Sequence, residues 1–300
     1  MMRYAYYPGC SLESTGVEYN MSAKAVAKHL GIELWEIPDW ICCGASAAHS
    51  TDHLLGLALP AYHLAVAEKE NLDVAVPCAA CYNRMRASQH AVRTSPELKE
   101  KICRAIEMEY NGTNEAVALL DLMANRVGTG EIKKHVTRPL TGLKVASYYG
   151  CLLVRPRETT GFDDPENPTS MDRIVEALGG EPVDWAFKTE CCGAGHTTTM
   201  TKDANVLLRN IFEDAVQNGA ECIATACPLC FLNLDMRQKG VEQAYGKAYN
   251  LPVFYFTELM GIAFGYSPKE MGVPKHFVNG VKLLEDKDLL RHPATRREEA

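Results

Sequence analysis

The chain lacks any segment that would direct it across or into a membrane. Its first residues, Met1 to Tyr4, lead into an alternating strand pattern instead of the apolar stretch of a secretory signal. The longest apolar run, residues 54–67, is interrupted by Pro60 and His63 and is too short to span a bilayer. We therefore expect a soluble cytoplasmic protein with no membrane span.

An excess of positive charge is also absent. The 300 residues include 31 Lys and Arg against 38 Asp and Glu, which gives a net charge of −7. Because proteins that bind nucleic acids normally carry a basic stripe, we expect no nucleic-acid partner. The chain also has no glycine-rich phosphate loop, no G-x-S-x-G elbow and no H-E-x-x-H helix. Any chemistry must therefore reside on other groups.

Cysteine, by contrast, is abundant, with 12 residues. Ten of them form one pattern that occurs twice, in which a single cysteine is followed by an adjacent pair and then by a Cys-x-x-Cys. The first copy consists of Cys10, Cys42, Cys43, Cys78 and Cys81, and the second of Cys151, Cys191, Cys192, Cys227 and Cys230. In both copies 34 residues separate the pair from the Cys-x-x-Cys. Structural disulfides are rare in a reducing compartment, so this content indicates metal or redox chemistry.

The residues around the cysteines repeat as well. Tyr6-Tyr7-Pro8-Gly9-Cys10 echoes Tyr148-Tyr149-Gly150-Cys151, with no counterpart for Pro8, and a glycine follows each adjacent pair, at Gly44 and Gly193. We expect these two glycines to adopt a positive φ angle or to let the backbone approach a bound group, although ordinary turn glycines occur at such places too. The repeat predicts two homologous halves, each with its own cysteine site.

Each half shows the same order of strands and helices. In the first half, the pattern predicts strands at 3–7, 32–37 and 73–76 and helices at 17–30 and 51–69. In the second half, it predicts strands at 144–148, 183–187 and 222–225 and helices at 171–178 and 204–217. Residues 155–168 read as a loop insertion and 97–126 as helical, and a further strand and helix are expected at 253–256 and 258–264.

This order predicts an α/β fold made of two Rossmann-like domains related by pseudo-twofold symmetry. We set the domains at 1–138 and 139–300, with the boundary near Pro139. Every cysteine group lies just beyond a predicted strand. Because ligands bind at the carboxyl ends of strands in open parallel sheets, the cysteines of each half should meet at one edge.

Five cysteines in each half exceed the four ligands of a structural zinc site. Two of the five are adjacent in sequence, and adjacent side chains point in different directions. They are therefore better suited to a larger group such as an iron–sulfur cluster, while zinc and disulfides remain the alternatives.

Cys103 and Cys222 have no counterpart in the other half, and we interpret both as small core residues. Among the histidines, which include His49, His53 and His63, only His196 is a candidate for a substrate pocket.

With these motifs, the chain resembles the cysteine-rich CCG domain family and, over nearly its full length, the B subunits of heterodisulfide reductases from methanogenic archaea. The resemblance runs from Cys10 and its neighbours to Cys227-Pro228-Leu229-Cys230. It implies that each set of five cysteines holds a non-cubane 4Fe-4S cluster. It also implies a catalytic subunit that reductively cleaves the mixed disulfide of coenzyme M and coenzyme B to the two thiols.

The resemblance implies partners and a charged rim. The partners would be the iron–sulfur C subunit and the flavin-containing A subunit of heterodisulfide reductase, and a hydrogenase or formate dehydrogenase module. Because both halves of that disulfide are anionic, basic side chains should line the pocket. Candidates follow the cysteine turns at Arg84, Arg155, Arg157 and Lys202, although a solvated surface charge is the simpler interpretation of each.

Two other functions remain open. The chain could be a CCG-domain electron-transfer subunit of another oxidoreductase, acting on lactate, glycolate, glycerol phosphate, succinate or a quinone. Relatives of that kind often carry ferredoxin-type cysteine segments, and this chain has none. It could also be a zinc-stabilised scaffold without catalysis of its own.

Overall fold

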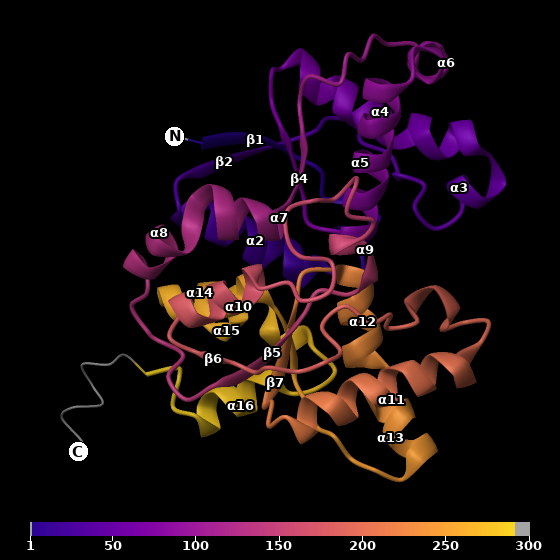
Figure 1. The fold of residues 1–300 in the computed structure, drawn as a ribbon. Coiled ribbons are helices and arrows are strands. Elements are labelled where there is room, and N and C mark those ends of the chain that lie inside the picture. The colour runs from indigo at the N-terminus through magenta and orange to yellow at the C-terminus, as the bar shows by residue number, and fades with distance from the viewer. Residues whose placement is uncertain (1, 292–300) are drawn as a thin grey trace.

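Two parallel four-stranded sheets form the frame of the molecule, one in each half of the chain (Figure 1). The structure, a computed structural model, describes residues 2–291. The first sheet has the order β2-β1-β3-β4, and the second has the equivalent order β6-β5-β7-β8. The strands are β1 (Met2–Tyr6), β2 (Ile32–Glu36), β3 (Val74–Val76), β4 (Ala116–Ala118), β5 (Lys144–Tyr148), β6 (Glu181–Pro182), β7 (Cys222–Thr225) and β8 (Val253–Tyr255). The predicted fold of two homologous Rossmann-like units is confirmed.

Helices connect the strands and cover the sheets. Those of the first half are α1 (Gly9–Leu12), α2 (Val17–His29), α3 (Ala48–Thr51), α4 (His53–Lys69), α5 (Ala79–Thr94) and α6 (Pro96–Ile106). Between the sheets come α7 (Leu119–Asp121), a π-helical turn η1 (Leu122–Gly128) and α8 (Thr129–Lys134). The second half has α9 (Cys151–Val154), α10 (Ser170–Ala177), η2 (Ala194–His196), α11 (Thr201–Gln217), α12 (Pro228–Met236), α13 (Gln238–Tyr245), α14 (Phe256–Phe264), α15 (Pro268–Met271), η3 (Val273–Lys275) and α16 (Gly280–Asp286). None of the helices within residues 2–291 combines the length and the apolar character that crossing a bilayer requires.

Local chemistry explains where the helices next to the cysteine sites begin. The predicted helix at 51–69 is interrupted at Asp52, which separates α3 from α4. Asp52 has an extended backbone and caps α4, because its carboxylate accepts a hydrogen bond from the Leu55 N–H at 2.7 Å. The α6 helix begins in the same way at Ser95, whose hydroxyl accepts from the Leu98 N–H, with Pro96 as the first helical residue. These caps fix the orientation of α4 and α6, which pack against each other.

Two predicted elements are confirmed only in part. The helix expected over 97–126 ends at Ile106, because Glu107 has a left-handed φ of 52°, and the buried run Ala116–Ala118 pairs with β3 as a strand. The strand expected at 183–187 is only the two residues of β6. Val183 donates the last sheet hydrogen bond, to Val145, and the Ala186 N–H then bonds to the Asp214 carboxylate, which draws the chain away from the sheet.

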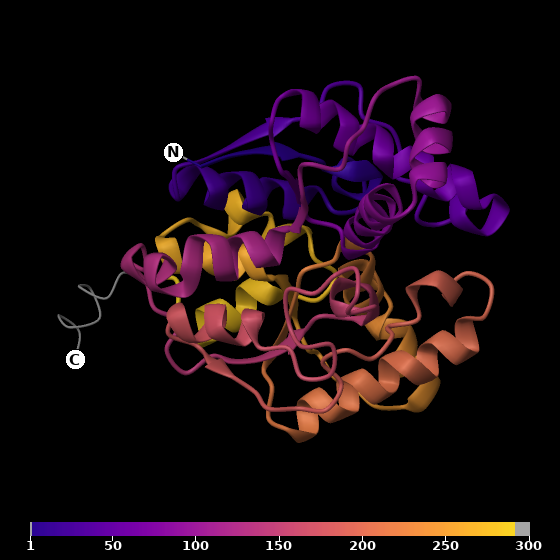
Figure 2. The same ribbon diagram turned by 45° about the horizontal axis from the view of Figure 1, so that its top comes forward.

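The two halves are packed tightly against each other. The ring of Tyr19 in α2 stacks on Tyr255 of the second half at a centroid distance of 4.1 Å, and Ser22 bonds to Thr257 at 2.7 Å in the buried contact between α2 and α14. Figure 2 shows α2 of the first half lying against the helices of the second. The sheets fall on either side of Pro139, but the exact domain limits of 1–138 and 139–300 stay a prediction.

The residues that follow Cys81 also bind the second half. Asn83 donates to the carbonyls of Leu152 and Arg155, and the buried Tyr82 hydroxyl donates to the Thr160 carbonyl at 2.9 Å. Residues 155–168, the expected loop insertion, contain no helix or strand and supply two of these acceptors. The insertion therefore fastens the second half to α5.

Tyr82→Phe should lower the free energy of unfolding by about 1 kcal/mol, because it leaves the buried Thr160 carbonyl without its donor. The measurement is a urea titration monitored by circular dichroism. Tyr245→Phe is the matched control, since within residues 2–291 no hydrogen bond of that hydroxyl is found and its ring lies over Arg209. Equal midpoints for the two variants would contradict the proposed contact.

Candidate metal centres

All ten repeated cysteines lie beyond the carboxyl ends of strands, as the sequence predicts. Cys10 is in α1 after β1, Cys42 and Cys43 follow β2, and Cys78 and Cys81 begin α5 after β3. The second half places its cysteines in the same way around β5, β6 and β7. Because parallel strands end at one edge of their sheet, each set of five gathers there.

The sulfur atoms of each set make the same contacts in both halves. In the first half, the Sγ atoms of Cys43 and Cys81 lie 3.1 Å apart. Cys78 lies close enough to Cys81, and Cys10 close enough to Cys42, to shift the pKa of its neighbour. In the second half the corresponding thiol pairs are Cys192–Cys230, Cys230–Cys227 and Cys191–Cys151. The pairing pattern is therefore part of the repeated unit.

A further thiol contact joins the halves. Cys78 and Cys227, which occupy the same position in their repeats, lie close enough together for each thiol to shift the pKa of the other. A contact between equivalent residues lies on the axis that relates the halves. The two cysteine sites therefore approach each other at Cys78 and Cys227, where the halves meet.

The sites are buried on the inside and open on the outside. The side chains of the inner thiols are buried, namely Cys43, Cys78, Cys81, Cys192, Cys227 and Cys230. Cys10, Cys42 and Cys191 are exposed, and Cys151 is half-buried. All twelve cysteines are free thiols. A bound group would thus be held from within the junction and reached by other molecules from the outer side.

A tyrosine fixes the adjacent pair in each half. The Tyr7 hydroxyl donates to the carbonyl of Ile41, just before Cys42, at 2.7 Å. The Tyr148 hydroxyl donates to the carbonyl of Glu190, just before Cys191, at 2.6 Å. The repeat therefore aligns Tyr7 with Tyr148 and Pro8 with Tyr149. The expectation that Tyr6-Tyr7 corresponds to Tyr148-Tyr149 is wrong, and so is the expectation that Pro8 has no counterpart. The sequence analysis assigned these tyrosines no role. The feature that could have identified them is a tyrosine three residues before Cys10 and again three residues before Cys151.

The glycines after the pairs do adopt the expected positive φ, 75° at both Gly44 and Gly193. Their N–H groups point back at sulfur, because Gly44 donates to Cys42 at 3.4 Å and Gly193 donates to Cys191 at 3.3 Å. Backbone N–H donors to sulfur stabilise thiolates and tune the potentials of clusters that thiolates ligate. The turns are therefore built to support ionised sulfur.

The electrostatics of the two sites differ at the exposed cysteines. A hydrogen bond from Cys151 is the largest cause that lowers the pKa of Cys191, to about 6, with the Gly193 N–H and His196 adding to it. Burial, by contrast, raises the pKa of the equivalent Cys42. His196 therefore lies close enough to act on a site cysteine.

The remaining candidates divide between the site rim and the body of the protein. Lys202 is exposed at the start of α11. Arg155 is half-buried, and its guanidinium bonds to the Pro165 carbonyl, Glu166 and Thr189, so it holds the inserted loop together.

Several other residues that the sequence singled out can also be placed. Arg157 is exposed and Arg84 bonds to Asn83. His49 and His53 are exposed, whereas the buried His63 accepts a hydrogen bond from the Ile41 N–H at 3.1 Å. Cys222 begins β7, at the strand end opposite the sites, and Cys103 lies in α6.

The donor set fits an iron–sulfur group. Each half offers five thiols in two linked clusters, with backbone N–H donors beside the outer pair. Within residues 2–291 no group of three or more His, Cys, Asp or Glu side chains surrounds a single metal-ion position. Gly9 and Gly150 leave room at the inner sulfurs, since a Cβ there would lie 3.5 Å from the Cys81 Sγ and 3.1 Å from the Cys230 Sγ.

Comparison with known proteins supports this assignment. The model of the cysteine-rich CCG domain matches residues 4–86 and 145–235, which coincide with the two repeats. The chain is 36% identical over 281 residues to the 8-methylmenaquinol:fumarate reductase membrane anchor subunit of Wolinella succinogenes, covering 93% of this chain and 98% of that protein. It is 29% identical to the B subunit of the ferredoxin:CoB-CoM heterodisulfide reductase of Methanosarcina mazei, covering 95% and 96%.

Among solved structures, a hypothetical protein from Helicobacter pylori superposes with a TM-score of 0.74 at 12% identity. The match covers 92% of this chain but only 52% of that one, so this chain spans about half of its length. At such low identity, the match shows a shared fold only.

In the metal-free chain, iodoacetamide should modify Cys191 faster than Cys42 at pH 7. Both side chains are exposed, but the pKa of Cys191 is lowered to about 6 and that of Cys42 is raised, so more of Cys191 is thiolate. Peptide mass spectrometry after short labelling measures the two rates. Equal rates, or faster modification of Cys42, would contradict the different environments of the two turns.

Proposed function

The chain belongs to the family of the cysteine-rich CCG domain, and from that membership we propose that it is the subunit of a multi-subunit iron–sulfur oxidoreductase that exchanges electrons with a lipophilic quinol. The observation that carries the proposal is that the two cysteine sites approach each other at Cys78 and Cys227, where the halves meet. Two equivalent redox centres at such a junction suit a two-electron substrate whose electrons leave one at a time. Homologues in heterodisulfide reductase complexes support the oxidoreductase class.

Each half holds one non-cubane 4Fe-4S cluster in this proposal. The ligands are Cys10, Cys42, Cys43, Cys78 and Cys81 in the first half, and Cys151, Cys191, Cys192, Cys227 and Cys230 in the second. When bound, such clusters supply one-electron redox chemistry. The protein buries the inner thiols, orients the outer pairs through Tyr7 and Tyr148, and donates backbone N–H groups to Cys42 and Cys191.

Similarity to a quinol-linked enzyme favours the quinol over the other substrates. The Wolinella relative is named for an 8-methylmenaquinol:fumarate reductase, and it shares 36% identity over nearly the whole of both chains. The heterodisulfide reductase relatives share 29% over similar lengths. We therefore favour the quinone-linked function, with a cytoplasmic location and with partner subunits that carry electrons to or from this chain.

Cleavage of the coenzyme M–coenzyme B disulfide is the second candidate. The symmetry of the two sites favours it, because each sulfur of a disulfide could end beside one cluster. His196 and Lys202 would then bind the anionic substrate, and the partners would be the C and A subunits of heterodisulfide reductase with a hydrogenase or formate dehydrogenase module. No protein cysteine of the two sets is left free for thiol–disulfide exchange in this mechanism.

Anaerobically purified chain should contain about eight irons and eight sulfides, as two four-iron clusters require. The paired substitutions Cys43→Ser with Cys81→Ser, and Cys192→Ser with Cys230→Ser, should each lower both values to about half, because each pair removes two buried ligands of one cluster. Cys103→Ser, outside both sets, is the control and should leave the content unchanged. Zinc in place of iron, or loss of all iron on changing one half, would contradict two separate clusters.

The two substrates can be separated by stopped-flow absorption of the cluster-loaded chain. A soluble naphthoquinol should reduce the oxidised clusters within the enzyme's turnover time. The mixed disulfide of coenzyme M and coenzyme B should not reoxidise the reduced clusters at a comparable rate. Fast reoxidation by the disulfide, with no reaction of the naphthoquinol, would replace the first candidate with the second.

A further inference from the structure

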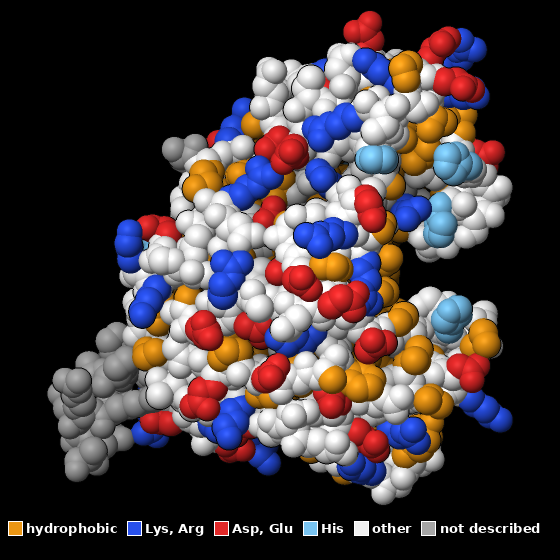
Figure 3. All heavy atoms as spheres, in the orientation of Figure 1, with side chains coloured by type: hydrophobic (Ala, Val, Ile, Leu, Met, Phe, Trp, Pro, Cys, Tyr) orange, Lys and Arg blue, Asp and Glu red, His pale blue; other side chains and the backbone are white. Residues whose placement is uncertain are grey.

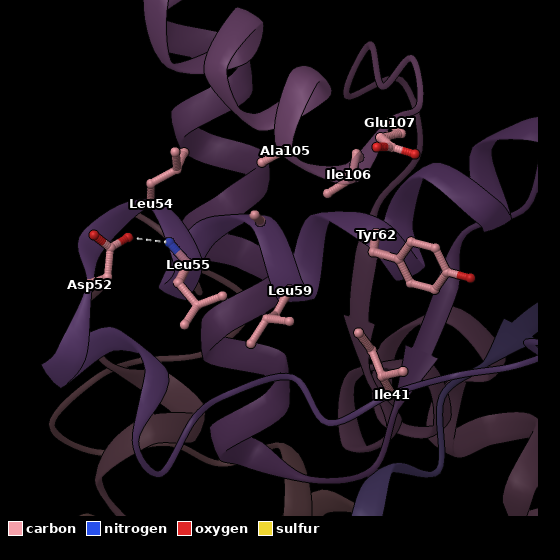
Figure 4. Close-up of a pocket in the computed structure, with 10 residues that line it drawn as sticks. Ile41, Asp52, Leu54, Leu55, Leu59, Tyr62, Ala105, Ile106 and Glu107 are labelled. Carbon is pink, nitrogen blue, oxygen red and sulfur yellow. Dashed lines mark hydrogen bonds between the residues drawn. The ribbon is translucent and has the colours of Figure 1, made fainter.

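An apolar pocket of about 490 Å³ lies beside the first cysteine site, outside the thiol group itself. Its walls come from α4, from the end of α6 and from the residue before Cys42 (Figure 4). The lining residues are Ile41, Asp52, Leu54, Leu55, Ala58, Leu59, Tyr62, Ala105, Ile106 and Glu107. Small-molecule sites typically occupy roughly 300–1,000 Å³ and are mostly apolar with a few polar groups, and this pocket meets both conditions.

The apolar wall of the pocket is exposed rather than covered by the protein. Ile41 is 45% exposed and Leu55 is 42% exposed. Figure 3 shows hydrophobic side chains on the outer face of this part of the molecule and along the recess between the two halves. The charged groups in the lining are Asp52 and Glu107, and the Asp52 carboxylate already caps α4. A concave pocket lined mostly by apolar side chains with a few polar groups is typical of small-molecule binding sites.

The equivalent surface of the second half is more polar. The last turns of α4 and α11 end in the same hydrogen bond, from Leu72 N–H to Ala67 and from Ala220 N–H to Ala215, which aligns the two helices. A leucine also lies against the glycine after each cysteine pair, Leu59 at Gly44 and Leu207 at Gly193, in agreement with this alignment.

In this alignment Leu54, Leu55 and Tyr62 correspond to Lys202, Asp203 and Asn210. Ile41, before the first cysteine pair, corresponds to Glu190 before the second. The fold therefore does not require apolar side chains at these four positions, although Ala58 and Leu59 keep apolar counterparts in Val206 and Leu207.

The pocket and the first cysteine site share one short segment of chain. Ile41 forms its wall and is followed by Cys42. The Ile41 peptide is held on both sides, because its carbonyl accepts from Tyr7 and its N–H donates to His63. Tyr62, also in the wall, packs edge-on against His63 at 5.4 Å between ring centroids. A ligand in the pocket would thus contact the residue that precedes the exposed Cys42.

We infer that this pocket binds the ring and the first part of the side chain of a lipophilic quinol. The inference deepens the proposed function, on which it rests, by assigning the substrate a place in the first half instead of between the halves. The leucines and Ile41 would cover the apolar ring and chain. The Tyr62 hydroxyl and the Glu107 carboxylate are the polar groups at the pocket available to a quinol hydroxyl.

The test uses the full chain, purified anaerobically with its clusters, and 2,3-dimethyl-1,4-naphthoquinone as the probe. This quinone has both ring positions blocked and therefore does not alkylate thiols. Equilibrium dialysis should show saturable binding at one site per chain. Leu55→Asp, which installs the residue of the second half at an exposed position near the start of α4, should raise the dissociation constant at least tenfold. Ile41→Glu should act in the same direction.

Val206→Asp is the matched control, because Val206 is 40% exposed on α11 and corresponds to Ala58 of the pocket wall. It should leave the dissociation constant unchanged. Iron content and the visible spectrum, measured on every variant, show whether the clusters are intact. Should Ile41→Glu disturb the neighbouring cluster, Leu55→Asp alone decides the result.

Three outcomes would overturn the inference. The first is failure of the cluster-loaded wild-type chain to bind the probe. The second is binding that Leu55→Asp does not weaken, which would place the probe elsewhere. The third is binding that disappears when partner subunits assemble on the chain, which would make the pocket a contact between subunits. None of these three outcomes depends on the iron content of the chain. By contrast, a chain that binds the probe but contains no iron would refute the proposed function without refuting binding at the pocket.

Discussion

The contact between Cys78 and Cys227 is the constraint on which the rest of the structure depends. These equivalent thiols meet where the halves join, so both sheets must present their carboxyl edges to the same place. Burying six thiols there is unfavourable for their ionised forms, and the surrounding groups offset this cost. Glycine N–H groups bond to the outer sulfurs, and tyrosines hold the chain before each adjacent pair. The packing of α2 against α14 and the bonds from Tyr82 and Asn83 to the inserted loop keep the junction closed.

The halves share their inner architecture and differ at their outer surfaces. The groups that support the thiols are repeated, including the tyrosine, the glycine and the order of thiol contacts. The residues that surround these groups on the outer surface are not repeated. Where the first half has Ile41 and Leu55, the second has Glu190 and Asp203, and His196 lies near Cys191. Under the proposed function, this difference would let the first half accept a lipophilic substrate while the second half faces a polar one.

The sequence was sufficient for the frame of the fold. The cysteine repeat and the strand–helix order predicted two parallel α/β units with their sites at the strand ends, since periodicity and turn residues are local properties. The strand Ala116–Ala118 was missed because it is short and pairs only through distant residues, and the 183–187 strand was confirmed only in part because a side chain, Asp214, captures the backbone. The Cys78–Cys227 contact, the roles of Tyr7 and Tyr148 and the apolar pocket depend on how the halves and helices pack, which no local pattern contains. His196 was singled out because it follows a cysteine pair in sequence, and its role in a substrate pocket stays a prediction.

Electron paramagnetic resonance of the reduced, cluster-loaded chain tests the central claim most directly, because it reports whether two redox centres meet at the junction. With both centres paramagnetic, the account predicts a spectrum broadened or split by magnetic interaction between them. Substitution of Cys192 and Cys230 by serine should convert it to the simple spectrum of a single centre. Two independent signals without interaction in the wild-type chain, or one signal that neither half's cysteines affect, would contradict the account.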